Sequence, residues 1–81
     1  MTKMSYQEFT MAYRILRMHF DDMSDWMQCE LHEPMAMVKE ETALWKAGGK
    51  EPDWADYAEW FNQICIEDGM PALFVSDEVA A

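Results

Sequence analysis

The chain has 81 residues, of which 16 are Asp or Glu and only 6 are Lys or Arg, so its formal charge at pH 7 is −10. This length predicts a single domain over residues 1–81. A content of 14% aromatic residues argues against disorder, because acidic disordered segments are poor in aromatics. The charge argues against direct binding of nucleic acid or anionic lipid, since both require a basic surface.

No stretch approaches about 18 uncharged apolar residues, so we expect no membrane span. The N-terminus also lacks the apolar core of a signal peptide. We therefore expect a cytoplasmic protein, located in the host cytoplasm if a phage encodes it. The two cysteines, Cys29 and Cys65, are too few for a disulfide framework, and we expect both to be reduced.

The first half of the chain predicts three helices. Ser5 and Glu8 form an S-x-x-E capping box, which begins the first helix. Pro34 suits the first position of a helix, and Gly48 suits the position just past a helix end. We therefore expect a second helix to end before Pro34 and a third to begin there. The expected ranges are about 6–20, 23–32 and 34–47.

The fourth helix, at about 53–68, has the clearest boundaries. Asp53 is expected to cap its start, and Gly69 lies just past its end. An apolar stretch then runs from Met70 to Val75, and we expect residues 76–81 to form a frayed tail. The predicted fold class is all-α, a small bundle of about four helices with a short extended C-terminal tail.

Acidic residues are segregated along the chain. Residues 1–20 sum to +2, and residues 21–81 sum to −12. Residues 21–33 contain five acids and residues 51–68 contain six, and neither stretch contains Lys or Arg to form salt bridges along a helix. On the fourth helix Trp60 is expected on the outward face, among carboxylates. These stretches predict an acidic surface with an aromatic anchor.

Carboxylates three or four residues apart on a helix are about 5–6 Å from each other. Phosphates along a nucleic-acid strand recur on a similar scale, so two acidic helices can present charges that a phosphate-binding cleft accepts. An ordinary solvated acidic face, with Trp60 packed on a neighbour, is the alternative. The candidate partner-binding residues are Asp21, Asp22, Asp25 and Glu33 in the first stretch and Asp53, Asp56, Glu59, Trp60, Glu67 and Asp68 in the second.

In size, acidity and helical content the chain is similar to small acidic inhibitors that imitate nucleic acid, such as phage anti-restriction and anti-CRISPR proteins. The similarity is one of composition and assigns no residues. It implies an inhibitor whose partner is a basic nucleic-acid-binding protein or complex. The alternative is an adaptor, antitoxin-like neutraliser or subunit, with a homodimer as one variant. In this alternative, the protein would bind its partner through an apolar surface around Trp60, Ile66 and residues 73–75.

We expect no enzyme, cofactor or metal. The sequence contains no Gly-rich phosphate loop and no H-E-x-x-H or G-x-S-x-G motif. Cys29-x-x-His32 has half of a zinc spacing, but a structural zinc site requires four ligands. Glu30 and Glu41 fall within apolar arcs of their helices, so each is expected to need a structural partner.

Overall fold

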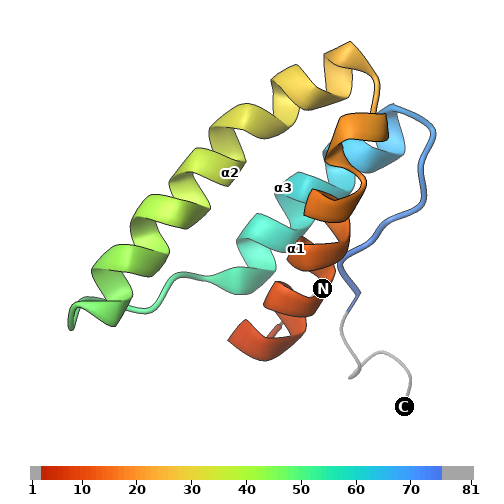
Figure 1. Cartoon of the computed structure of the whole chain (residues 1–81). Coiled ribbons are helices and arrows are strands. Elements are labelled where there is room, and N and C mark those ends of the chain that lie inside the picture. The colour runs from red at the N-terminus through yellow and green to blue at the C-terminus, as the bar shows by residue number, and fades with distance from the viewer. Residues whose placement is uncertain (1–2, 76–81) are drawn as a thin grey trace.

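The computed structural model describes residues 3–75, and within this range every regular element is helical. The fold is therefore all-α, as predicted. Figure 1 shows the three α-helices in order along the chain. They are α1 (Tyr6–Met18), α2 (Asp25–Lys46) and α3 (Trp54–Glu67), with the 3-10 turn η1 (Phe20–Asp22) between α1 and α2.

The start of α1 is fixed by the predicted capping box. The Ser5 hydroxyl accepts a hydrogen bond from the Glu8 backbone N–H at 3.1 Å, and the Glu8 carboxylate accepts one from the Ser5 N–H at 2.9 Å. The helix ends at Met18, two residues before the predicted end. There the backbone tightens into η1, in which the Asp22 N–H donates to the His19 carbonyl.

The two helices predicted at 23–32 and 34–47 are one continuous helix, so the described residues contain three α-helices and not about four. Pro34 lies inside α2. A proline inside a helix removes one backbone hydrogen bond and costs about 3 kcal/mol. Here the ring is fully buried between the buried residues Leu31 and Val38. A continuous helix keeps this apolar stripe in one line, and its burial offsets the cost.

The predicted boundaries of α3 are correct to one residue. The Asp53 carboxylate accepts hydrogen bonds from the Ala55 and Asp56 N–H groups, as an N-cap does. At the other end Gly69 adopts φ +83°, and the Met70 N–H donates to the Cys65 carbonyl. This is a Schellman motif, which satisfies carbonyls left over at the helix end.

The three helices form a flat molecule of 36 × 32 × 17 Å. Helix α3 packs against both α1 and α2, whereas α1 and α2 meet near η1 and diverge from there (Figure 1). The core lies along α3 and is rich in aromatic rings. Because α1 and α2 share so little contact, each keeps a flank that no other described element covers.

After α3 the chain runs back beside α1 (Figure 1), and Phe74 is completely buried. Its ring centroid lies 5.2 Å from those of Phe9 and Phe61. The Asn62 side chain holds the same residue by its backbone, donating to the Phe74 carbonyl at 2.8 Å and accepting from its N–H at 2.9 Å. The frayed tail predicted at 76–81 lies outside the described residues.

Candidate functional site

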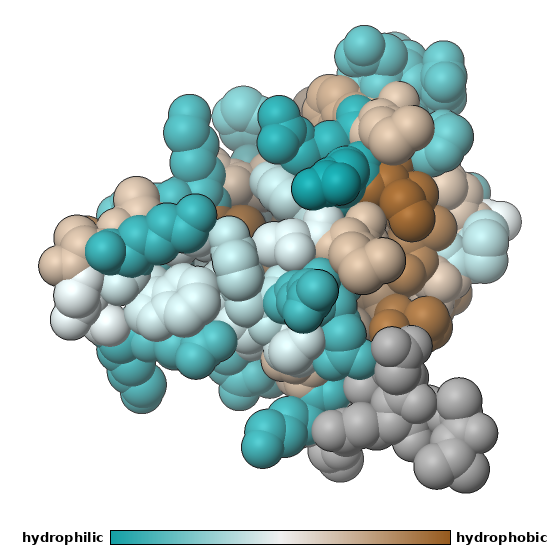
Figure 2. All heavy atoms as spheres, turned by 60° about the horizontal axis from the view of Figure 1, so that its bottom comes forward, coloured by the Kyte–Doolittle hydropathy of each residue, from teal (hydrophilic) through white to brown (hydrophobic). Residues whose placement is uncertain are grey.

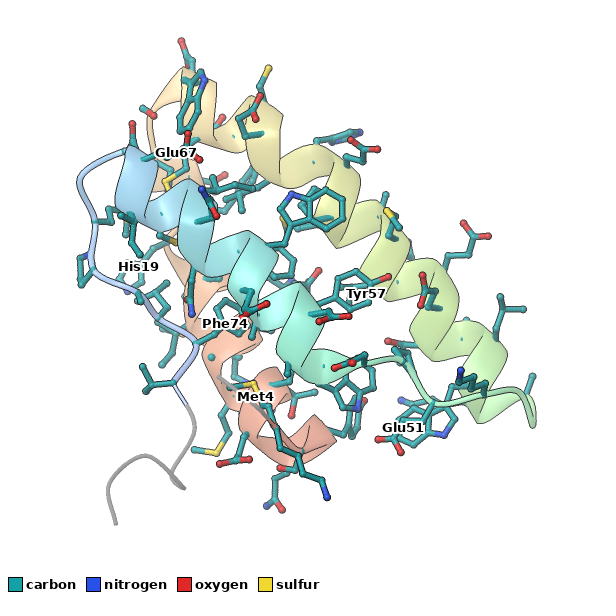
Figure 3. The ribbon with its side chains drawn as sticks, turned by 180° about the vertical axis from the view of Figure 1, so that it is seen from behind. Met4, His19, Glu51, Tyr57, Glu67 and Phe74 are labelled. Carbon is teal, nitrogen blue, oxygen red and sulfur yellow. The ribbon has the colours of Figure 1, made fainter. Side chains whose placement is uncertain are left out.

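Five of the predicted site residues come together at one end of the molecule. The contact that joins them is a hydrogen bond from the Ser24 hydroxyl, at the start of α2, to the Asp68 carboxylate, at the end of α3, at 3.1 Å. Figure 3 shows Glu67 at this end of α3, beside the start of α2. All five side chains are exposed. We call this group the acidic end, and it consists of Asp21, Asp22, Asp25, Glu67 and Asp68.

The helix dipoles act differently on the members of the acidic end. The C-terminus of α3 disfavours a carboxylate at Glu67 and Asp68 by about 0.3–1 kcal/mol each. The Asp68 carboxylate, however, is bonded to Ser24, the N-cap of α2, where the dipole of that helix favours negative charge. The bond to Ser24 therefore gives the Asp68 carboxylate a structural role, whereas no residue in the described range 3–75 makes such a contact with Glu67.

The other predicted residues lie along α2 and α3, away from the acidic end. Asp53 begins α3, whose 14 residues place it about 20 Å from Glu67. The Asp53 carboxylate is also engaged in capping the helix. Asp56, Glu59 and Glu33 have exposed side chains. Among the described residues, the two acidic stretches therefore share a surface only where η1 and the start of α2 meet the C-terminal end of α3.

Trp60 is partly exposed, with 36% of its surface accessible, and it stacks on Tyr57 at 6.5 Å with an angle of 6° between the rings. Its outward position agrees with the sequence prediction. Ile66 is 60% exposed. Figure 2 shows strongly hydrophobic side chains gathered beside the C-terminal end of the described chain. The sequence predicted residues 73–75 on an apolar surface with Trp60 and Ile66, but Phe74 is fully buried in the core and cannot belong to such a surface.

Tyr57 extends from α3 toward α2 (Figure 3). Its hydroxyl is buried and makes no hydrogen bond of standard geometry to any described residue. Burial raises the Tyr57 pKa above its usual value, and the nearby Glu41 carboxylate raises it further. Glu41 is half-buried and acts on the Tyr57 hydroxyl, whereas Glu30 is exposed, so its predicted position within an apolar face is wrong.

The two thiols differ in environment. Cys29 is exposed and Cys65 is fully buried in the core. Burial raises the pKa of the Cys65 thiol, and the Asp68 charge adds to the effect. Cys65 is therefore a packed apolar side chain and does not complete a site with Cys29 and His32. Within residues 3–75 there is no cluster of three or more His, Cys, Asp or Glu side chains suited to a metal ion.

One feature was not predicted from the sequence. A groove between α1 and α2 is lined by four basic side chains, Arg14, Arg17, Lys39 and Lys46. We call it the basic groove. The spacing of Arg14 and Arg17, one turn apart, indicates a shared face. The position of Lys39 and Lys46 across the groove from these arginines depends on how α1 and α2 pack, so the sequence pattern alone does not indicate it.

No helix among the described residues combines the length and the hydrophobicity needed to cross a membrane. Searches against protein-family models, curated proteins and solved structures give no match for this chain.

Proposed function

We propose that the protein is a small acidic inhibitor that imitates the charge of nucleic acid and blocks a basic nucleic-acid-binding protein, as phage anti-restriction and anti-CRISPR proteins do. The observation that carries the proposal is the convergence of two acidic stretches, 21–25 and 67–68, at the acidic end. Such an inhibitor acts by occupying a cleft and performs no chemistry. A cytoplasmic target, in the host if a phage encodes the protein, is part of this proposal.

Charge segregation supports this assignment. Four of the six Lys and Arg residues line the basic groove, and the remaining two, Lys3 and Lys50, precede α1 and α3. The sequence segments that form the acidic end contribute no basic residue to it. A surface of one sign attracts a basic partner and speeds association, and salt weakens both effects. Binding through the acidic end is therefore expected to be fast and strongly dependent on ionic strength.

The experiment is a pull-down from a cell extract with the tagged protein, at about 0.1 M and about 1 M salt, where the screening length falls from about 10 Å to about 3 Å. The test variant carries Asp22→Lys and Glu67→Lys in the acidic end. The matched control carries Glu30→Lys and Glu40→Lys, which change the net charge equally on exposed positions of α2. We expect duplex DNA to compete with the tagged protein for the captured partner. We also expect the Asp22→Lys, Glu67→Lys variant to capture no partner, whereas the control variant still captures it.

A second candidate function is that of a protein–protein module that binds through Trp60 and Ile66. The partial exposure of Trp60 and the 60% exposure of Ile66 favour it. An exposed aromatic side chain is a common anchor in interfaces. In this case Trp60→Ala abolishes capture, while the acidic-end variant does not. Measurement of the molar mass in solution tests the homodimer variant of this function.

A further inference from the structure

The basic groove has a cavity volume of about 1020 Å³ and runs between α1 and α2. Its four basic side chains, Arg14 and Arg17 on one rim and Lys39 and Lys46 on the other, are all exposed. None of the described residues that line it is Asp or Glu. In a chain with 16 acids and 6 Lys or Arg, this is a strong local reversal of charge.

Helix α2 separates its charges by face. At about 100° per residue, Lys39 and Lys46 lie within about 20° of each other, toward the groove. Glu33 and Glu40 lie about 100–120° away from Lys39 around the helix axis. One helix therefore presents a basic flank to the groove and an acidic flank turned away from it.

The bottom of the groove is apolar. Tyr13, Phe20 and Met35 line it and keep part of their surface exposed, and the buried Phe9, Val38 and Trp54 line it as well. At the wide end of the groove the rings of Tyr6, Trp45 and Trp54 pack together, with centroids 5.0–5.7 Å apart. At the narrow end Phe20 of η1 lines the wall. The groove is therefore a bounded trough with an apolar floor and basic rims.

We propose that the basic groove binds an amphipathic acidic helix of a partner protein. The apolar side of that helix lies on the floor, and its carboxylates meet the basic residues of both rims, which is the helix-in-groove mode of recognition. Helix α1 has 13 residues, so the groove is about 20 Å long and accommodates a bound helix of similar length. This site is separate from the acidic end and does not depend on the function proposed for it.

Charge complementarity distinguishes this occupant from two others. A second copy of the chain related by two-fold symmetry would set identical basic rims against each other, and such like-charge contacts cost several kcal/mol. Nucleic acid carries far more charge than four cations neutralise, and the rest of the molecule repels it.

The test uses a dye-labelled synthetic peptide of 14 residues, with leucines on one helical face and glutamates flanking them. Its binding to the full chain is followed by fluorescence anisotropy. The test variant carries Arg14→Glu and Lys39→Glu. The matched control carries Lys3→Glu and Lys50→Glu, which change the net charge equally at exposed positions outside the groove. Circular dichroism and urea unfolding verify that each variant folds. If a double variant does not fold, the single substitution Lys39→Glu in the groove is compared with the single substitution Lys50→Glu outside it.

We expect the groove variant to weaken peptide binding at least about tenfold and the control to weaken it less than about twofold. A peptide with glutamine in place of glutamate is expected to bind at least about tenfold less tightly to the unmodified protein. Equal loss in the groove variant and its control would overturn the proposal. So would tighter binding of a single-stranded oligothymidylate than of the peptide, or the absence of peptide binding at about millimolar concentration.

Discussion

Ser24 and Asp68 are 44 positions apart in the chain, and a 3.1 Å hydrogen bond joins their side chains. Ser24 is the N-cap of α2 and also accepts a hydrogen bond from the Met27 N–H. Asp68 ends α3. This contact holds the end of one helix against the start of the other, and it turns two separate acidic stretches into one surface.

Replacement of Ser24 tests this contact. Ser24→Ala removes the cap of α2 and the bond to Asp68, and we expect it to lower the free energy of unfolding by about 1–2 kcal/mol. Asn and Asp are N-caps of similar strength. We therefore expect Ser24→Asp to be less stable than Ser24→Asn, since only the former adds a charge beside Asp68. Urea unfolding should show this difference shrinking at about 1 M salt. A difference that does not respond to salt would contradict the proximity of the two charges.

Asn62 and Phe74 fix the C-terminal segment, and we expect both to determine stability. Phe74→Ala should lower the free energy of unfolding by about 3–5 kcal/mol, because a buried aromatic ring is removed. Asn62→Ala should lower it by about 1–3 kcal/mol, because two backbone groups lose their partner. Val75→Ala is the control, since Val75 is 65% exposed and should change stability by less than about 0.5 kcal/mol. Equal effects of Phe74→Ala and Val75→Ala would show that the segment does not pack on the core.

Tyr57 predicts how stability changes at alkaline pH. Its pKa in the folded protein is raised above the usual 10.0, whereas the unfolded chain ionises near that value. The folded state therefore holds the Tyr57 proton more tightly. This contribution to stability is fully present below pH 10 and is lost as the pH rises above it. The free energy of unfolding, measured with urea, should therefore fall between about pH 9 and pH 11, and we expect it to fall less steeply in Tyr57→Phe.

The flattening is expected to be partial, because burial also raises the pKa of Tyr13 and of Cys65. Glu41→Gln supplies the matched measurement. It removes the carboxylate that acts on the Tyr57 hydroxyl, so ionisation of Tyr57 should begin at a lower pH in tyrosinate absorbance. An alkaline stability profile that is identical in Tyr57→Phe and the unmodified protein would contradict this assignment.

The helix ends were predictable where a local signal sets them. Ser5 and Asp53 cap their helices through bonds within three residues, and Gly69 supplies the positive φ that ends α3. Pro34 misled the prediction because its position is decided by tertiary burial. A proline is favourable at a helix start and also tolerated inside a helix whose apolar stripe is covered.

The exposure of Trp60 and of the candidate carboxylates was predictable one residue at a time, but the surface that they form was not. Helical phase placed Trp60 outward, and the structure agrees. The convergence of Asp22 and Glu67 depends on the contact between Ser24 and Asp68, which no periodicity encodes. The basic groove depends in the same way on the divergence of α1 and α2.

The most direct test of the proposed function is the salt dependence of affinity for the protein that the pull-down captures. We expect the dissociation constant to rise at least tenfold between about 0.1 M and about 0.5 M salt. For the Asp22→Lys, Glu67→Lys variant we expect weak binding with a smaller salt effect, and for the Glu30→Lys, Glu40→Lys control we expect retained affinity. An affinity that is independent of salt, and that Trp60→Ala abolishes, would contradict the nucleic-acid mimic and support the apolar interface.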